Sequence, residues 1–172
     1  MAVVVEIKKS KKYELGVISP MIPLNANCYR MLLEKYGVLE LYEKKFGSAV
    51  LGGNPHREIE KNPDVAKFMW CETMPHLDVI AADVVNEEGY IICGTRLSIG
   101  FILFNRSLWE DMQGFVVYGN MDLGIDEEDV NSFCINQSRV MAIAKNAIVG
   151  HFGFGKQTDE MKKFYNLYQE RF

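Results

Sequence analysis

The sequence lacks the features that mark membrane and secreted proteins. Its longest apolar stretches, such as 140–149, are interrupted by Lys145 and Asn146 and are far shorter than the roughly 20 residues that cross a bilayer. At the N-terminus the apolar stretch precedes the basic one, which reverses the order of a secretory signal. We therefore expect a cytoplasmic protein that does not associate with membranes.

The chain also lacks the residue patterns of metal and disulfide sites. Widely spaced cysteines without a C-x-x-C pair are typical of reduced core residues, and the three histidines have no partner at metal-ligand spacing. The acidic stretch 126–129 does not follow the residue order of a calcium loop. We predict no metal site, and the sequence identifies no cofactor. The cysteines are Cys28, Cys71, Cys93 and Cys134.

Sequence motifs of several large functional classes are missing as well. There is no G-x-S-x-G, no H-E-x-x-H and no G-x-G-x-x-G after a predicted strand, which disfavours the familiar hydrolase and dehydrogenase classes. The net charge of −4 argues against nucleic acid as a partner, because such binding depends on clustered cations. The one local exception is a basic run made of Lys8, Lys9, Lys11 and Lys12.

What is present is the composition of a globular protein. The 172 residues are 48% hydrophobic and 24% charged, and no linker interrupts them, so we predict a single globular domain over 1–172. The order of the predicted elements indicates an α+β fold, in which helices pack on one face of an antiparallel sheet made of an N-terminal hairpin and a central meander. The predicted strands are 2–8, 13–18, 77–85, 90–94, 99–104 and 115–118.

Capping residues and apolar periodicity predict the helices. Asn62 followed by Pro63 is a strong start signal, and the apolar spacing after the acidic stretch predicts one long helix over 126–148, with Gln137 on its apolar stripe. Asp78 and Asp83 lie in the most apolar predicted strand and are the carboxylates expected to be buried. The remaining helices are predicted after Asn25, over 38–46, near Ser107 and after Thr158.

A glycine-rich loop near the C-terminus is the candidate ligand site. Residues 150–158 approach a phosphate-loop pattern, but Gln157 stands where the pattern needs a hydroxyl. Too little chain follows to complete such a nucleotide-binding domain. The loop can still form an anion site at a helix N-terminus, or it is an ordinary turn between helices. The candidate ligand-binding residues are Gly153, Gly155, Lys156 and Thr158.

The candidate catalytic residues are few and scattered. His76 and Asp78 are two residues apart at the start of a predicted strand, which would place both on one face and let the carboxylate orient the imidazole. His151 lies in the glycine-rich loop. The structural alternative for each histidine is a surface residue with no chemical role.

These observations lead to three hypotheses for the function. The first is a binding or regulatory module for a small anionic or phosphorylated ligand or for a protein partner. The second is a small transferase or hydrolase in which Lys156 holds a phosphate and His76 or His151 transfers a proton. The third is a homodimer or partner interface formed through aromatic- and methionine-rich faces that include Trp70, Trp109 and the C-terminal helix ending at Phe172.

Overall fold

The chain divides into two compact units. Unit 1 comprises residues 1–20 and 87–145, and unit 2 comprises 21–86 and 146–172. The division does not test the single-domain prediction, which stays a prediction. None of the helices in the described parts of the chain is long and apolar enough to cross a bilayer. The computed structural model describes residues 14–22, 28–49, 62–94, 96–115, 124–150 and 158–171.

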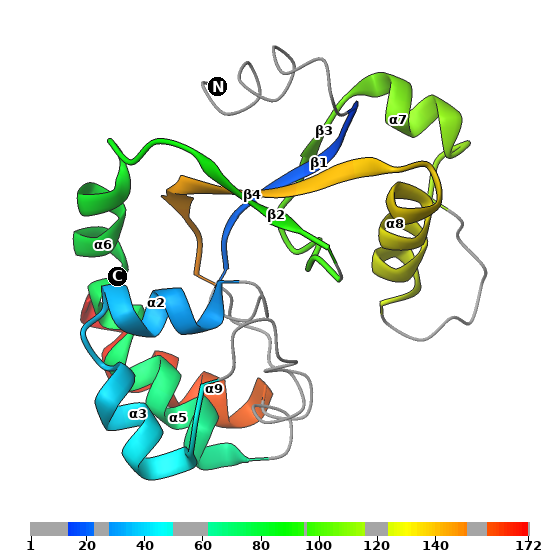
Figure 1. The fold of residues 1–172 in the computed structure, drawn as a ribbon. Coiled ribbons are helices and arrows are strands. Elements are labelled where there is room, and N and C mark those ends of the chain that lie inside the picture. The colour runs from blue at the N-terminus through cyan, green and yellow to red at the C-terminus, as the bar shows by residue number, and fades with distance from the viewer. Residues whose placement is uncertain are drawn as a thin grey trace. The chain divides into compact units, whose positions relative to one another are not determined.

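A four-stranded sheet has the order β2-β4-β1-β3. The outer pairs are antiparallel, with Tyr90 opposite Ala144 and Val17 opposite Phe104. The two central strands, β1 and β4, run in the same direction (Figure 1). The α+β class is therefore confirmed, but the prediction of a purely antiparallel sheet is wrong. The strands are β1 (Glu14–Met21), β2 (Tyr90–Cys93), β3 (Leu103–Phe104) and β4 (Arg139–Ile148).

The predicted central meander is wrong at its first strand. Residues 77–84 form the helix α6 (Leu77–Val84) rather than a strand, and β2 pairs with β4, which follows much later in the sequence. The predicted strand 99–104 is reduced to the two residues of β3. The predicted strand 13–18 is confirmed as part of β1, whereas 2–8 and most of 115–118 lie outside the described residues.

The long helix predicted over 126–148 is two elements. The helix α8 (Ile125–Asn136) ends in a turn, and β4 follows at once. Ser138 has a positive φ of 53°, a left-handed conformation that reverses the chain and cannot continue a helix. Gln137 therefore lies at the end of α8, exposed to solvent, and not on a buried stripe.

Two helices cover one face of the sheet in unit 1. The helix α7 (Arg106–Asp111) begins after Asn105, close to the predicted start at Ser107. Its buried Leu108 and the buried Val130 of α8 line the same small apolar space as Val17 of β1. The stacking of Trp109 on Phe104 places α7 beside β3.

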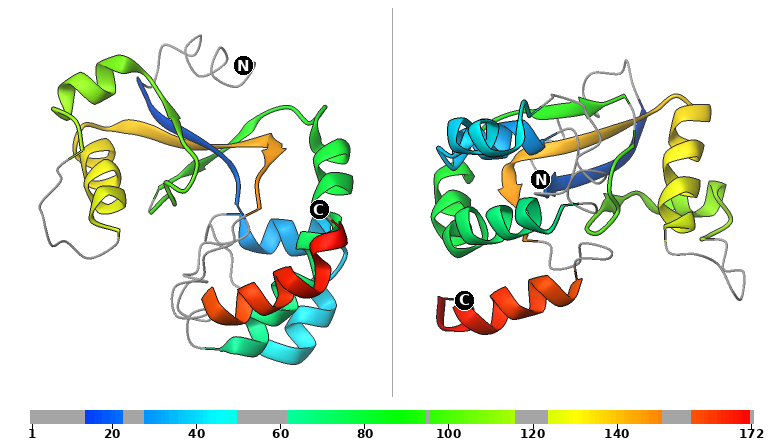
Figure 2. Two further views of the ribbon diagram at one scale, coloured as in Figure 1. Left: turned by 180° about the vertical axis from the view of Figure 1, so that it is seen from behind. Right: turned by 90° about the horizontal axis from the view of Figure 1, so that it is seen from below.

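Unit 2 is a group of helices around an aromatic core. In both orientations α5 lies between α3 and α9 (Figures 1 and 2). The Phe68 ring of α5 is 5.6 Å from the Phe46 ring of α3, and Lys67 of α5 lies over the Phe164 ring of α9. The elements are α2 (Tyr29–Lys35), α3 (Leu39–Phe46), α5 (Pro63–Glu72), η1 (Met74–His76), α6, α9 (Thr158–Tyr168) and η3 (Gln169–Arg171).

Local signals predicted the start of α5 and the end of α2. The side chain of Asn62 accepts a hydrogen bond from the Asp64 N–H at 3.0 Å and so caps α5, as predicted. Gly37 follows α2 with a φ of 68°, a conformation that glycine adopts without steric cost.

Trp70 is 0% exposed in the core of unit 2, so the prediction that it forms part of a dimer surface is wrong.

Candidate functional site

The structure separates the candidate catalytic residues of the sequence. His76 ends the short helix η1 and Asp78 lies in the first turn of α6, and both are exposed. The two residues lie in successive helices and not in a strand, so the shared strand face predicted for this pair is wrong. Asp83 is also exposed on α6, and the prediction that Asp78 and Asp83 are buried is wrong. The catalytic roles of His76 and Asp78 stay predictions.

The predicted anion site falls largely outside the described residues. This holds for His151 and for Gly153, Gly155 and Lys156, while Thr158 is the first residue of α9. In the first turn of α9 the exposed Asp159 pairs with Lys162 at 3.5 Å. The Asp159 carboxylate already occupies the positive end of the helix dipole, where it would repel a bound anion. The anion site stays a prediction.

The buried cysteines are poor nucleophiles. Burial raises the pKa of the Cys93 thiol to about 12. Burial also raises the pKa of Cys134 to about 11, against a smaller lowering effect of the nearby Arg139. Both thiols are therefore protonated at neutral pH, and only thiolates react readily. Within the described part of the chain, no group of three His, Cys, Asp or Glu side chains could hold a metal ion.

The strand β3 is an open edge of the described sheet. It ends the strand order and pairs with β1 alone among the described strands. In an antiparallel pair, residues alternate between bonding to the neighbouring strand and directing their N–H and C=O groups away from it. Since Leu103 and Phe104 are consecutive in the register with β1, one of them presents both groups at the open edge.

The exposed side chains at this edge are apolar. Leu103 of β3 is 59% exposed, and Phe101, in the bend that precedes β3, is 56% exposed. Natural edge strands are commonly protected by charged residues or proline, and residues 101–104 contain neither. We call the surface formed by Phe101, Leu103 and Trp109 the β3 edge surface.

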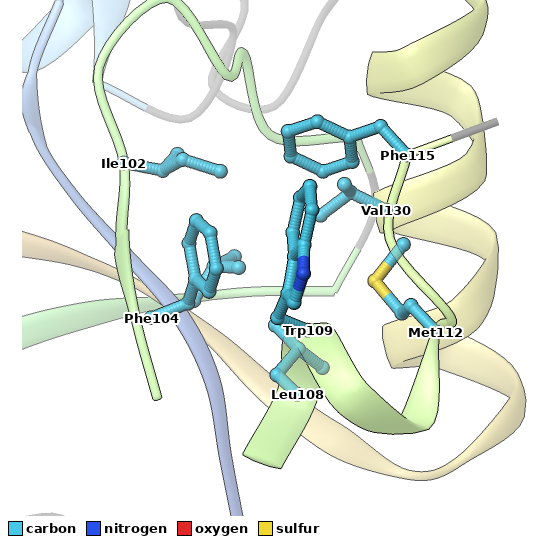
Figure 3. A pocket seen from close by; sticks show the side chains of 8 residues that line it. Ile102, Phe104, Leu108, Trp109, Met112, Phe115 and Val130 are labelled. Atoms are coloured by element: carbon cyan, nitrogen blue, oxygen red, sulfur yellow. The ribbon is translucent and has the colours of Figure 1, made fainter. Parts of the chain in front are cut away.

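A stacked aromatic cluster supports the other side of β3 (Figure 3). The ring of Phe104 stacks on Trp109 at 6.3 Å, and Trp109 meets Phe115 edge-to-face at 4.9 Å. The spaces between the cluster side chains are too small for a water molecule. Trp109 is nevertheless 41% exposed, so the cluster forms a firm apolar wall with one side open to solvent. The other contributors are Val17, Ile102, Leu108, Met112 and Val130.

Two polar side chains of α8 hold the segment that leads into β3. The buried amide of Asn131 accepts a hydrogen bond from the Leu97 N–H at 2.7 Å and donates one to the Leu97 carbonyl at 2.9 Å. The Glu127 carboxylate accepts hydrogen bonds from Arg96 Nε at 2.5 Å and from the Ile99 N–H at 3.2 Å. Both contacts fix the backbone before β3, which lowers the ordering cost of binding there.

Among the described residues of unit 1, carboxylates outnumber cations. Arg139 is nine-tenths buried and pairs with Glu14 at 3.2 Å and with Asp111 at 2.5 Å. Arg106 is held by Glu110 at 2.7 Å. The cations in the described part of unit 1 are Arg96, Arg106, Arg139 and Lys145. They are outnumbered by the carboxylates Glu14, Glu87, Glu88, Glu110, Asp111, Asp126, Glu127, Glu128 and Asp129.

Sequence reasoning missed Phe101, Leu103 and Asn131 as candidate site residues. The available signal was the uncharged run FILF at 101–104 just before a tryptophan, but the run predicts an edge only when the strand order is known. Comparisons with protein-family models, curated proteins and solved structures give no match for this chain. The β3 edge surface is therefore interpreted from its geometry and charge.

Proposed function

We propose that this protein is a binding module that recognises a protein partner through the β3 edge surface. The observation that carries the proposal is the gathering of Phe101, Leu103 and Trp109, each about half exposed, around a strand edge that no other described strand covers. Aromatic residues are enriched in the centres of protein interfaces, and tryptophan is among the residues that contribute most binding energy.

The supporting structure favours recognition over catalysis. The aromatic cluster and the Asn131 contacts hold the surface in one conformation, as binding surfaces require. The candidate acid–base residues His76 and Asp78 are exposed and lie in two successive helices, η1 and α6. The transferase or hydrolase hypothesis therefore has less support, and the small anionic ligand remains the alternative for the loop at 150–158.

A selection from a library of random peptides tests the proposal. The immobilised protein should enrich peptides that bind wild type but bind Leu103→Gln more weakly. The matched control is Ile92→Gln, because Ile92 lies on β2 at the other edge of the same sheet and is 53% exposed. The proposal fails when no peptide is enriched, or when the enriched peptides bind wild type and Leu103→Gln equally.

A further inference from the structure

We infer that the partner contributes an extended, basic segment that joins the sheet as a strand beside β3. The inference rests on the proposed function and specifies its binding mode and the charge of the partner. Strand addition to an open edge is an established way of binding extended peptides: main-chain hydrogen bonds supply affinity and alternate side chains supply specificity.

The backbone of β3 provides the hydrogen-bonding half of this mode. One residue of the pair Leu103 and Phe104 directs its N–H and C=O groups away from β1. An added strand lies about 4.8 Å from its neighbour, so its side chains pass beside Leu103. A helical partner forms its backbone hydrogen bonds internally. It would therefore leave the N–H and C=O groups at the edge of β3 without partners.

The side chains predict an apolar partner strand. Leu103 of β3 and Phe101, in the bend just before it, are both exposed, and the half-exposed Trp109 stacks on Phe104, the other residue of β3. Side chains directly opposite each other on neighbouring strands contact at about 4.5–5.5 Å. An apolar partner residue opposite Leu103 therefore contacts its side chain, and the exposed Phe101 favours a further apolar residue in the same partner segment.

The charges of the described residues beside β3 favour a basic segment over an acidic one. Glu14 opens β1, the strand paired with β3, and Asp111 ends α7, whose Trp109 stacks on Phe104. Both carboxylates are about half exposed, whereas the arginine between them, Arg139, is nine-tenths buried. A partner lysine or arginine meets accessible negative charge, and an acidic partner is repelled.

Two blocked decapeptides of opposite charge test this inference on the full chain. One alternates valine with lysine, and the other alternates valine with glutamate. We expect the valine–lysine peptide to bind at least about tenfold more tightly and to weaken as the salt concentration rises. Hydrogen exchange measured by mass spectrometry should slow at residues 101–105 and stay unchanged at 90–93, the edge formed by β2.

The outcomes separate the inference from the proposed function. The inference is overturned if neither decapeptide binds, if both bind equally, or if the bound peptide leaves exchange at 101–105 unchanged. Library peptides that still depend on Leu103 in any of these cases leave the proposed function standing with a different binding mode. Absence of any Leu103-dependent peptide removes both.

Discussion

Replacement of Gly16 by alanine should destabilise unit 1 through steric crowding. A Cβ atom at Gly16 would lie 2.6 Å from the Cys134 sulfur, 3.1 Å from the Arg139 Cβ and 3.3 Å from the Val140 carbonyl oxygen. The first distance is far below van der Waals contact, and the crowded atoms belong to α8 and β4. The strand β1 requires glycine at position 16 because the neighbouring atoms of α8 and β4 leave no room for a methyl group.

The expected size follows from two opposing effects. Overpacking a well-packed interior costs about 1–3 kcal/mol. Gly16 does not have a positive φ, so alanine can adopt its backbone conformation, and the less flexible unfolded chain offsets about 0.4–1 kcal/mol. Taking the middle of both ranges, the net loss is about 1.3 kcal/mol in the free energy of unfolding, or roughly 3–5 °C in Tm for a chain of 172 residues.

The assay follows unit 1 alone. Trp70 lies in unit 2 and Trp109 in unit 1, and they are the two tryptophans of the chain. In a Trp70→Phe parent, Trp109 emission during urea unfolding reports on unit 1. Gly16→Ala should lower the urea midpoint in this parent.

A double-mutant cycle identifies the cause. Cys134→Ala removes the closest atom, so Gly16→Ala should cost about 1 kcal/mol less in that background. An unchanged urea midpoint in Gly16→Ala, or an equal cost with and without the Cys134 sulfur, would refute the steric explanation.

Three further predictions concern other parts of the chain. Asn131→Ala leaves the buried N–H and C=O of Leu97 without partners and should cost about 2–4 kcal/mol, measured by urea unfolding; a loss below about 0.5 kcal/mol would contradict it. Burial raises the pKa of Cys93 from 9.0 to about 12, so its contribution to stability is full below pH 9 and is lost as the pH rises toward 12. Wild type should therefore lose stability more steeply than Cys93→Ala between pH 9 and 11, and parallel curves would contradict this. If the predicted anion loop binds pyrophosphate, saturation at about 100 times Kd should raise Tm by roughly 5–10 °C in wild type and not in Lys156→Ala; no shift in wild type counts against the loop.

The parts of the fold that were predictable from sequence depend on local chemistry. Asn62 and Pro63 specify the start of α5 through a side-chain hydrogen bond and a fixed φ, neither of which needs tertiary context. Gly37 and Gly47 likewise mark the ends of α2 and α3 by adopting positive φ angles. Signals of this kind act within a few residues of one another.

The errors occurred where two apolar segments are compatible with either helix or strand. Residues 77–84 and 139–148 are apolar at both helical and strand spacings, so periodicity alone cannot distinguish the two. Pairing with β1 and β2 makes 139–148 a strand, and 77–84 has no strand partner. The turn at Ser138 carries no glycine or proline to mark the end of α8.

The candidate site was unpredictable for a related reason. Sequence reasoning ranks residues by chemical type and therefore selected His76, Asp78 and Lys156. The β3 edge surface depends instead on strand order and exposure, which arise only when β1 pairs with β3 and β4. An apolar side chain such as Leu103 is indistinguishable from a core residue until its neighbours are known.

The most direct test of the account is the affinity of one enriched peptide for wild type, Leu103→Gln and Ile92→Gln. Losing the apolar contact of a half-exposed leucine corresponds to about 1.4 kcal/mol, or a tenfold rise in Kd. We predict that rise for Leu103→Gln and a Kd within about twofold of wild type for Ile92→Gln. Equal effects of the two substitutions, or no effect of Leu103→Gln, would contradict recognition at the β3 edge surface.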